Sequence, residues 1–198
     1  MRIDSFTIAA LADELRLAVM GGRVQQIWQL TPLSFELEIY AQRRRRYLHL
    51  SADPQAPCAY LQSTKPRRGA GKPTPLTQLF RKYLRGSLLL TVEQPPFERL
   101  LMFHFSGRAG ESTTVLEMLG SRSNLLFLDA AGRILALARP GGPKTGPRRA
   151  LLPNHPYRLP RPQQKLTPAD LTPAALQTAL SRLPPETPLG KALAGLLH

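Results

Sequence analysis

The sequence predicts an α+β protein with a mostly antiparallel β-core and two flanking helices. Apolar residues recur at helical spacing in two segments, residues 5–19 and 75–86. The other short apolar runs are rich in strand-forming residues, and most are joined by turns too short to hold a crossover helix, which favours antiparallel pairing. A chain of 198 residues is long enough to bury a core without disulfides or metals.

The first predicted helix covers residues 5–19. Its apolar residues lie on one helical face, and they are Ile8, Leu11, Ala12, Leu15 and Val19. Asp4 or Ser5 can cap the start, because their side-chain oxygens accept a hydrogen bond from an unpaired helix N–H group. Gly21 and Gly22 predict the end, because glycine adopts the left-handed conformation at low cost.

A set of strands is predicted to follow this helix. Their ranges are 24–30, 34–40, 47–51 and 58–62. The strand over 34–40 alternates Phe35, Leu37 and Ile39 with Glu36, Glu38 and Tyr40, so we expect it to be half-buried. The consecutive arginines Arg43 to Arg46 are expected at a hairpin tip.

The second predicted helix begins at Pro75, after a basic loop rich in proline and glycine over residues 63–74, and ends at Gly86. An antiparallel meander is expected next, over 88–94, 99–105, 112–119, 124–129 and 133–138. Residues 139–165 are basic and proline-rich, with little regular structure expected. Thr172-Pro173 and Thr187-Pro188 predict two final helices near 173–182 and 188–197.

The strong positive charge predicts an anionic partner. The net charge is +14, and the sequence pI is near 11.0. Acidic residues are absent between Asp53 and Glu93 and again between Asp129 and Asp170, so the positive charge is concentrated in blocks. These blocks lie mostly in loops rather than on an amphipathic basic helix, which favours nucleic acid over a lipid surface or a mere contribution to solubility.

Other classes of function find little support in the sequence. The four histidines are scattered and there is a single cysteine, so we predict no metal site and no cofactor. No catalytic or phosphate-binding motif stands in its required context, so we expect no enzyme and no small-molecule substrate. No apolar run approaches the roughly 18 residues of a membrane span, and no export signal is recognised. We therefore expect a cytoplasmic protein.

Several segments, in order, resemble the N-terminal domain of the NFACT family of ribosome-associated quality-control proteins, which includes RqcH, FbpA and NEMF. They are "MGGRVQQIWQ" (20–29), "LHLSADPQAP" (48–57), "LFRKYLRG" (79–86) with "PFERLL" (96–101), "LEMLGSRSNLLFLD" (116–129) and "LLPNHPY" (151–157). The resemblance implies that residues 1–160 form this domain and that 166–198 begin a truncated helix-hairpin-helix domain. It also implies a fold like the N-terminal domain of formamidopyrimidine-DNA-glycosylase-like proteins. Arg2-Ile3 replaces the proline and glutamate that those glycosylases use in catalysis.

The resemblance also implies site residues. Glu98-Arg99 stands where the family has an acid–arginine pair, usually Asp-Arg, implicated in tRNA recognition and in tailing stalled chains. Asp4 matches a family acid, with helix capping as its alternative role. Arg122 lies in the counterpart of the family's "GRHSN" turn, and we expect it to contact tRNA. The expected contacts to RNA backbone are Arg67, Arg68, Arg81, Lys82 and Arg85, where the alternative is a solvated basic surface.

The implied partners are the large ribosomal subunit with its rRNA, and tRNA. As part of a longer protein, the domain would bind a stalled subunit carrying peptidyl-tRNA and recruit tRNA, alanyl-tRNA being expected. Peptide-bond formation would be left to the ribosome. Two alternatives are a glycosylase-like DNA-binding protein and a fibronectin-binding surface adhesin. The missing export signal argues against the adhesin.

Overall fold

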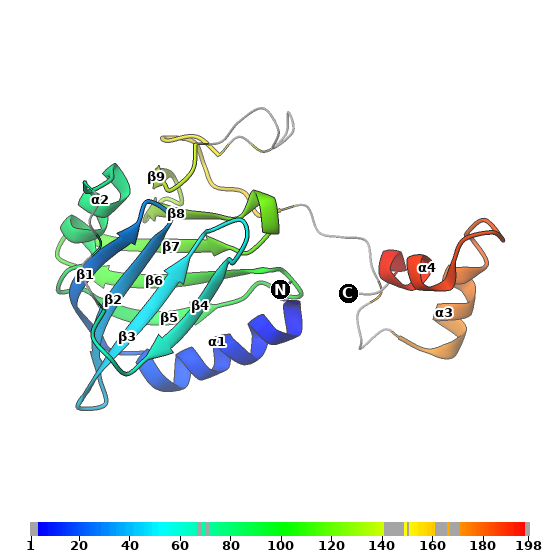
Figure 1. Ribbon diagram of the computed structural model, residues 1–198, viewed down its shortest axis with the longest axis horizontal. Helices are drawn as coiled ribbons and strands as arrows, with labels where there is room; N and C mark the ends of the chain where they lie inside the picture. Colours follow the sequence, from blue (N-terminus) through cyan, green and yellow to red (C-terminus); the bar gives the residue numbers. More distant parts are fainter. Residues whose placement is uncertain are drawn as a thin grey trace. The chain divides into compact units, whose positions relative to one another are not determined.

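The computed structural model describes residues 4–66, 69, 72–140, 149, 151–160, 166 and 171–196. The chain divides into two compact units, Met1–Leu159 and Pro160–His198. The first unit holds a sheet with helices α1 and α2, and the second holds helices α3 and α4 (Figure 1). This arrangement confirms the predicted α+β class with a mostly antiparallel core.

The helices are α1 (Ser5–Val19), α2 (Pro75–Tyr83), α3 (Pro173–Leu180) and α4 (Leu189–Leu196), with a short 3-10 helix η1 (Gly120–Arg122). The strands are β1 (Arg23–Thr31), β2 (Ser34–Ala41), β3 (Arg44–Ser51), β4 (Cys58–Gln62), β5 (Leu88–Glu93), β6 (Leu100–Gly107), β7 (Gly110–Glu117), β8 (Asn124–Asp129) and β9 (Ile134–Leu137). They form one sheet in the order β4-β3-β2-β1-β5-β6-β7-β8-β9, and the pairs are antiparallel.

The sheet folds into two layers at the junction of β1 and β5. These strands pair only briefly, around Arg23 and Leu88, and the β1–β4 and β5–β9 layers face each other across the core (Figure 1). Phe80 of α2 links the layers, because its ring contacts Phe35 of β2 at 5.3 Å and Phe127 of β8 at 5.4 Å between centroids. Helix α2 therefore closes the core between the two layers.

The hairpin between β2 and β3 differs from its prediction. The turn consists of Gln42 and Arg43, whose φ angles are 49° and 61°, and Ala41 pairs with Arg44 across it. Two left-handed residues in succession are typical of the two-residue turn that matches the twist of a hairpin. The placement of Arg43 to Arg46 at the tip was therefore wrong for the last three arginines, which open β3.

Strand β2 was predicted to be half-buried, and this was also wrong. Glu36 has no exposed surface and Glu38 is 5% exposed. Glu36 accepts a hydrogen bond from Gln62 and lies 3.4 Å from His49 Nδ1, and Glu38 lies 3.5 Å from Arg45. These partners compensate the buried carboxylates, which would otherwise be costly.

His49 is expected to make stability depend on pH. Burial opposes protonation of the ring, but hydrogen bonds and charge interactions with Cys58 and Glu36 outweigh it and raise the pKa of His49 from 6.5 to about 9. A raised pKa stabilises the fold fully below about pH 6.5, and this stabilisation is lost as the pH rises through 9. We expect the free energy of unfolding to fall by up to about 3 kcal/mol across this window.

Urea unfolding of the wild type and His49→Gln between pH 6 and pH 9.5 measures this contribution. The difference between the two proteins should shrink as the pH rises, because other titrating groups affect both equally. A difference that stays constant over the window would contradict the assigned role of His49.

The proline-rich segment after β9 packs against the sheet and is hydrogen-bonded to it. Leu151 is buried in a second apolar cluster with residues of β6 to β9. Arg149 donates hydrogen bonds to the buried Glu117 at the end of β7, and the Tyr157 hydroxyl donates to Glu117 Oε1 at 2.8 Å. Burial, together with the Glu117 charge, raises the pKa of Tyr157. Of the predicted span 139–165, the described residues form no helix or long strand, and the others lie outside the described part of the chain.

The second unit contains the two predicted terminal helices. The side chain of Thr172 caps α3 by accepting a hydrogen bond from the Ala175 N–H group, as the Thr-Pro pattern predicted. The identity of this unit as the start of a helix-hairpin-helix domain stays a prediction.

Candidate nucleic-acid interface

The Glu98-Arg99 pair lies in a fixed loop between β5 and β6. The Glu98 N–H group donates to the Pro95 carbonyl at 3.0 Å, and Phe97 adopts a left-handed φ of 57°. The Phe97 ring packs edge-on against Phe6 of α1, with centroids 6.1 Å apart. Glu98 and Arg99 are both half-buried, so this pair is held in place and remains accessible at the surface.

Hydrogen bonds join this loop to two other segments that carry predicted site residues. The Gln94 side-chain amide donates to the Ser5 carbonyl at 2.8 Å and to the Glu98 carbonyl at 2.9 Å. The Arg99 carbonyl accepts from the Met118 N–H group at 2.8 Å. The start of α1, the loop over 94–99 and the segment that leads into η1 therefore meet at one end of the domain, where α1 begins in Figure 1.

Asp4 is the N-cap of α1. Its Oδ1 accepts a hydrogen bond from the Thr7 N–H group at 2.7 Å, which is the capping role that the sequence analysis gave as an alternative. The N–H group and hydroxyl of Thr7 hold the pKa of Asp4 below its usual value, so the carboxylate is charged at neutral pH. Asp4 is exposed, and capping engages one of its two carboxylate oxygens.

Arg122 is exposed at the end of η1. The turn around it is built by the residues that match the family pattern: Gly120 adopts a φ of 63°, and the buried Asn124 exchanges hydrogen bonds with the backbone of Arg139. Arg139 also donates from its guanidinium to the carbonyls of Ser121 and Ser123. Sequence reasoning missed Arg139, because no motif includes it and only the β8–β9 pairing brings it beside the turn.

The basic residues of α2 and of the turn that follows it form a separate patch, the α2 patch. Arg81, Lys82 and Arg85 are exposed, and the Lys82 ammonium lies 5.3 Å from the Tyr83 ring centroid. Strand β5 separates this patch from the Glu98 loop, and a strand of that length spans about 20 Å. The structure therefore does not bring the predicted backbone contacts together with Glu98 and Arg99. Arg67 and Arg68 lie outside the described residues.

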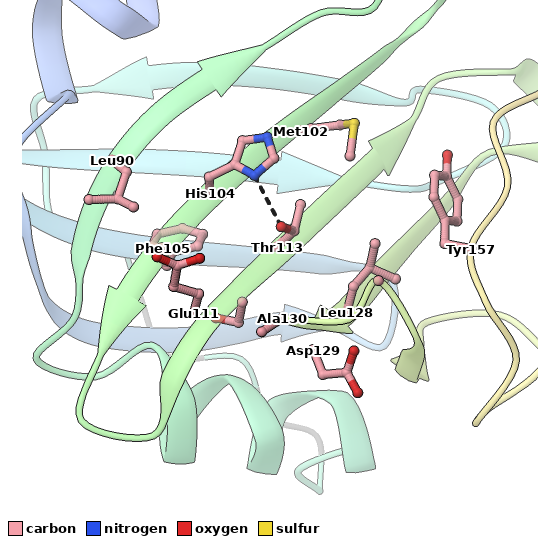
Figure 2. Close-up of a pocket in the computed structure, with 12 residues that line it drawn as sticks. Leu90, Met102, His104, Phe105, Glu111, Thr113, Leu128, Asp129, Ala130 and Tyr157 are labelled. Atoms are coloured by element: carbon pink, nitrogen blue, oxygen red, sulfur yellow. Dashed lines mark hydrogen bonds between the residues drawn. The ribbon is translucent and has the colours of Figure 1, made fainter.

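A cavity of about 380 Å³ lies on the outer face of the β5–β9 layer (Figure 2). It is lined by Leu90, Met102, His104, Phe105, Glu111, Ser112, Thr113, Leu128, Asp129, Ala130, Gly132 and Tyr157. His104 lies 3.1 Å from the Thr113 hydroxyl and 3.2 Å from the Glu93 carboxylate. The three side chains satisfy one another's hydrogen-bonding groups across neighbouring strands. Sequence reasoning missed this cluster, because strand register alone assembles it.

Within the described part of the chain, no group of three or more His, Cys, Asp or Glu residues could hold a metal ion. No helix in the same residues is long and apolar enough to cross a membrane.

Known relatives cover most of this chain. The chain is 29% identical to the Rqc2 homolog RqcH of Streptococcus pneumoniae (strain D39) over 174 residues, which is 85% of the chain and 31% of that protein. It is 27% identical to the RqcH of Bacillus subtilis (strain 168) over 176 residues, 86% of the chain and 31% of that protein. The chain thus spans about a third of the length of these relatives.

Solved structures share the fold. The N-terminal domain of the fibronectin-binding protein PavA from Streptococcus pneumoniae superposes with a TM-score of 0.78 at 29% identity, covering 90% of this chain and 68% of that one. The fibrinogen-binding protein from Staphylococcus aureus has a TM-score of 0.80 at 22% identity, covering 100% and 70% respectively, and supports the fold alone. The family model described as NFACT N-terminal and middle domains matches residues 4–198. The chain therefore belongs to the NFACT family.

Proposed function

We propose that this chain is the tRNA-contacting part of an RqcH-like factor that acts in ribosome-associated quality control. The longer protein would bind the large ribosomal subunit that carries stalled peptidyl-tRNA, with contacts to rRNA, and would recruit tRNA for tailing of the nascent chain. The observation that carries the proposal is the hydrogen-bonded convergence of the segments that hold Asp4, Glu98, Arg99 and Arg122. Membership of the NFACT family and the net charge of +14 support it.

Recognition at this end would rely on the acid–arginine pair. A guanidinium offers a rigid planar set of donors for a phosphate or a base edge, and a carboxylate beside it accepts from a base amino group. Because the loop is already fixed by Gln94, Pro95 and Phe97, little conformational entropy is lost when RNA binds. The chain itself would catalyse no reaction, and peptide-bond formation would fall to the ribosome.

The α2 patch would contact the sugar-phosphate backbone of the same RNA. Its distance from the Glu98 loop, about 20 Å along β5, suits a ligand as long as tRNA rather than a mononucleotide. Phosphate contacts of this kind release counterions, so tRNA affinity should fall steeply as salt rises.

Titration of the chain with tRNA alanine transcripts between 50 and 200 mM salt tests the proposal. Binding with a salt-dependent affinity is expected, and replacing Lys82 and Arg85 by alanine should lower the slope of log affinity against log salt by about 2. Co-sedimentation of the full-length parent with large subunits tests the wider role. Absence of tRNA binding at 50 mM salt would contradict the proposal.

Gln94→Ala should weaken tRNA binding without unfolding the domain. The substitution removes the hydrogen bonds that join Ser5 to Glu98, and it leaves both carbonyls in place. We expect tRNA affinity to fall by about tenfold and the free energy of unfolding by about 1–2 kcal/mol. Gln78→Ala, at an exposed position of α2, is the matched control. Unchanged tRNA affinity in Gln94→Ala would mean that coupling of these segments plays no part in recognition.

One alternative function follows from the name of a similar structure, the fibronectin-binding protein PavA. A surface adhesin would be found outside the cell, whereas our proposal places the parent in the cytoplasm. Cell fractionation that recovers the parent at the surface, and not with ribosomes, would favour the adhesin. The glycosylase-like alternative predicts nicking of abasic DNA, and we expect none.

A further inference from the structure

Polar aromatic side chains gather on the outer face of the β1–β4 layer, which we call the aromatic face. Trp28, Tyr40, Tyr47 and Tyr60 share this face by strand register, whereas Phe35, Phe80, Phe103, Phe105 and Phe127 are fully buried in the core. Within the first unit, no described helix covers this face in Figure 1. Tyr40 and Tyr60 are exposed on this face, and Tyr47 is 6% exposed beneath them.

Register arranges the aromatic face in rows across the strands. One row reads Trp28, Glu36, His49 and Tyr60; the next reads Gln26, Glu38, Tyr47 and Gln62; a third reads Arg23, Tyr40 and Arg45. Each row places rings beside cationic or amide side chains. This is the mixture that single-stranded nucleic acids need, since bases stack on rings while cations and amides contact phosphates and base edges.

The rings offer supported flat surfaces. The His49 and Tyr60 rings stack, with centroids 4.7 Å apart and an interplanar angle of 24°, and Tyr60 remains 42% exposed. Tyr40 is 48% exposed. Trp28 contacts the Tyr47 ring at 6.1 Å, and the Lys65 ammonium lies 5.7 Å from the Trp28 centroid. Such packing fixes Tyr60 and Trp28 before any ligand arrives.

The accessible charge of the aromatic face is positive. Its carboxylates, Glu36 and Glu38, are buried and lie beside His49 and Arg45. Arg23, Arg45 and Lys65 are exposed. Among the described residues, the large apolar side chains that are exposed on this face are Tyr40 and Tyr60, with no exposed leucine, isoleucine or methionine. This composition favours an RNA strand over the apolar surface of a protein partner.

We propose that the aromatic face binds unpaired RNA nucleotides by stacking bases on Tyr60, Tyr40 and Trp28. Arg23, Arg45 and Lys65 contact the phosphates, and the amide of Gln26 reaches base edges. The inference rests on the proposed RNA-binding function and adds a second contact surface, made by residues other than the Glu98 loop. It commits to an unstructured strand, such as a looped-out rRNA segment, as the occupant.

The test uses the intrinsic fluorescence of Trp28, which is the single tryptophan of the chain. Titration of the full chain with decauridylate, which cannot form a duplex with itself, should quench this fluorescence to saturation. Tyr60→Ala should weaken binding by about tenfold or more, and Tyr60→Phe should restore it, because stacking needs the ring and not the hydroxyl. Leu90→Ala, at a 44% exposed position on β5, is the matched control and should bind like the wild type.

Tyr40→Ala provides a second variant. The Tyr40 side chain is more exposed than that of Tyr60 and is distant from Glu36 along β2, so its loss leaves the contact between Glu36 and His49 intact. It should also weaken decauridylate binding. Absence of quenching, or quenching that is equal in wild type, Tyr60→Ala and Tyr40→Ala, would overturn the inference. A protein ligand on this face with no response to decauridylate would overturn it too.

The two proposals can fail separately. Glu98→Ala with Arg99→Ala should lose tRNA binding and keep the decauridylate response. A wild type that binds tRNA but gives no Trp28 quenching with decauridylate would contradict the aromatic-face inference and leave the proposed function standing. A wild type that responds to decauridylate but does not bind tRNA would contradict the proposed function and leave the aromatic-face inference standing.

Discussion

Replacing Glu98 and Arg99 together by alanine is expected to reduce tRNA affinity by at least about a hundredfold. Hydrogen bonds to charged groups are worth about 1.5–3 kcal/mol each, and the double variant removes two charged groups from a fixed loop. The fold should persist, because the substitutions leave in place the backbone hydrogen bonds of Glu98 and Arg99 with Pro95, Gln94 and Met118. In the full-length parent, tailing of stalled chains should be abolished.

Titration with labelled tRNA measures the affinity, and circular dichroism checks the fold. Glu98→Asp is the matched control, because the family usually carries aspartate at this position, and it should retain binding. A double variant that binds tRNA like the wild type, or a parent that still tails normally, would show that the pair has been assigned the wrong role.

Phe80→Ala is expected to have the largest effect on stability. The ring joins the two layers of the sheet through Phe35 and Phe127, has no exposed surface, and sits on the helix that carries the basic patch. Removal of a buried phenylalanine side chain costs about 3–5 kcal/mol, because it loses apolar burial and leaves a cavity.

Urea unfolding monitored by circular dichroism measures this loss. Arg81→Ala, one residue further along α2 and exposed, should change the free energy of unfolding by less than about 0.5 kcal/mol. A loss below about 1 kcal/mol in Phe80→Ala would mean that α2 does not close the core.

The elements were largely predictable because local signals agree with the fold. Strands β4 and β8 have the predicted bounds, 58–62 and 124–129, since turn residues flank short apolar runs on both sides. Helix α1 also begins and ends where its capping aspartate and its glycines predicted. Helix α2 is shorter than predicted and ends at Tyr83, and Gly86 takes a left-handed φ of 83° beyond it.

The errors arose where distant partners decide the outcome. Glu36 and Glu38 look like the solvent face of a strand, and only the register with β3 and β4 brings His49, Arg45 and Gln62 to compensate them. The tight hairpin at Gln42 and Arg43 uses two left-handed residues without glycine, so no turn signal marks it.

The candidate site was located by family resemblance rather than by local pattern. Glu98 and Arg99 alone read as an ordinary strand start. Two sets of hydrogen bonds bring this pair close to the segments that hold Asp4 and Arg122. They are the bonds of the Gln94 amide and the bond between Met118 and Arg99, which link positions far apart in sequence. No motif marked the His104 cluster or the contacts of Arg139 with the turn, because strand pairing creates both.

Residue-resolved crosslinking of tRNA to this chain, repeated with the full-length parent on purified large subunits, tests the central claim most directly. Crosslinks should concentrate in the start of α1, the loop over 94–99 and the turn at η1, with further sites on α2. Crosslinks that avoid all of the first three segments, while the RNA stays bound, would contradict the account.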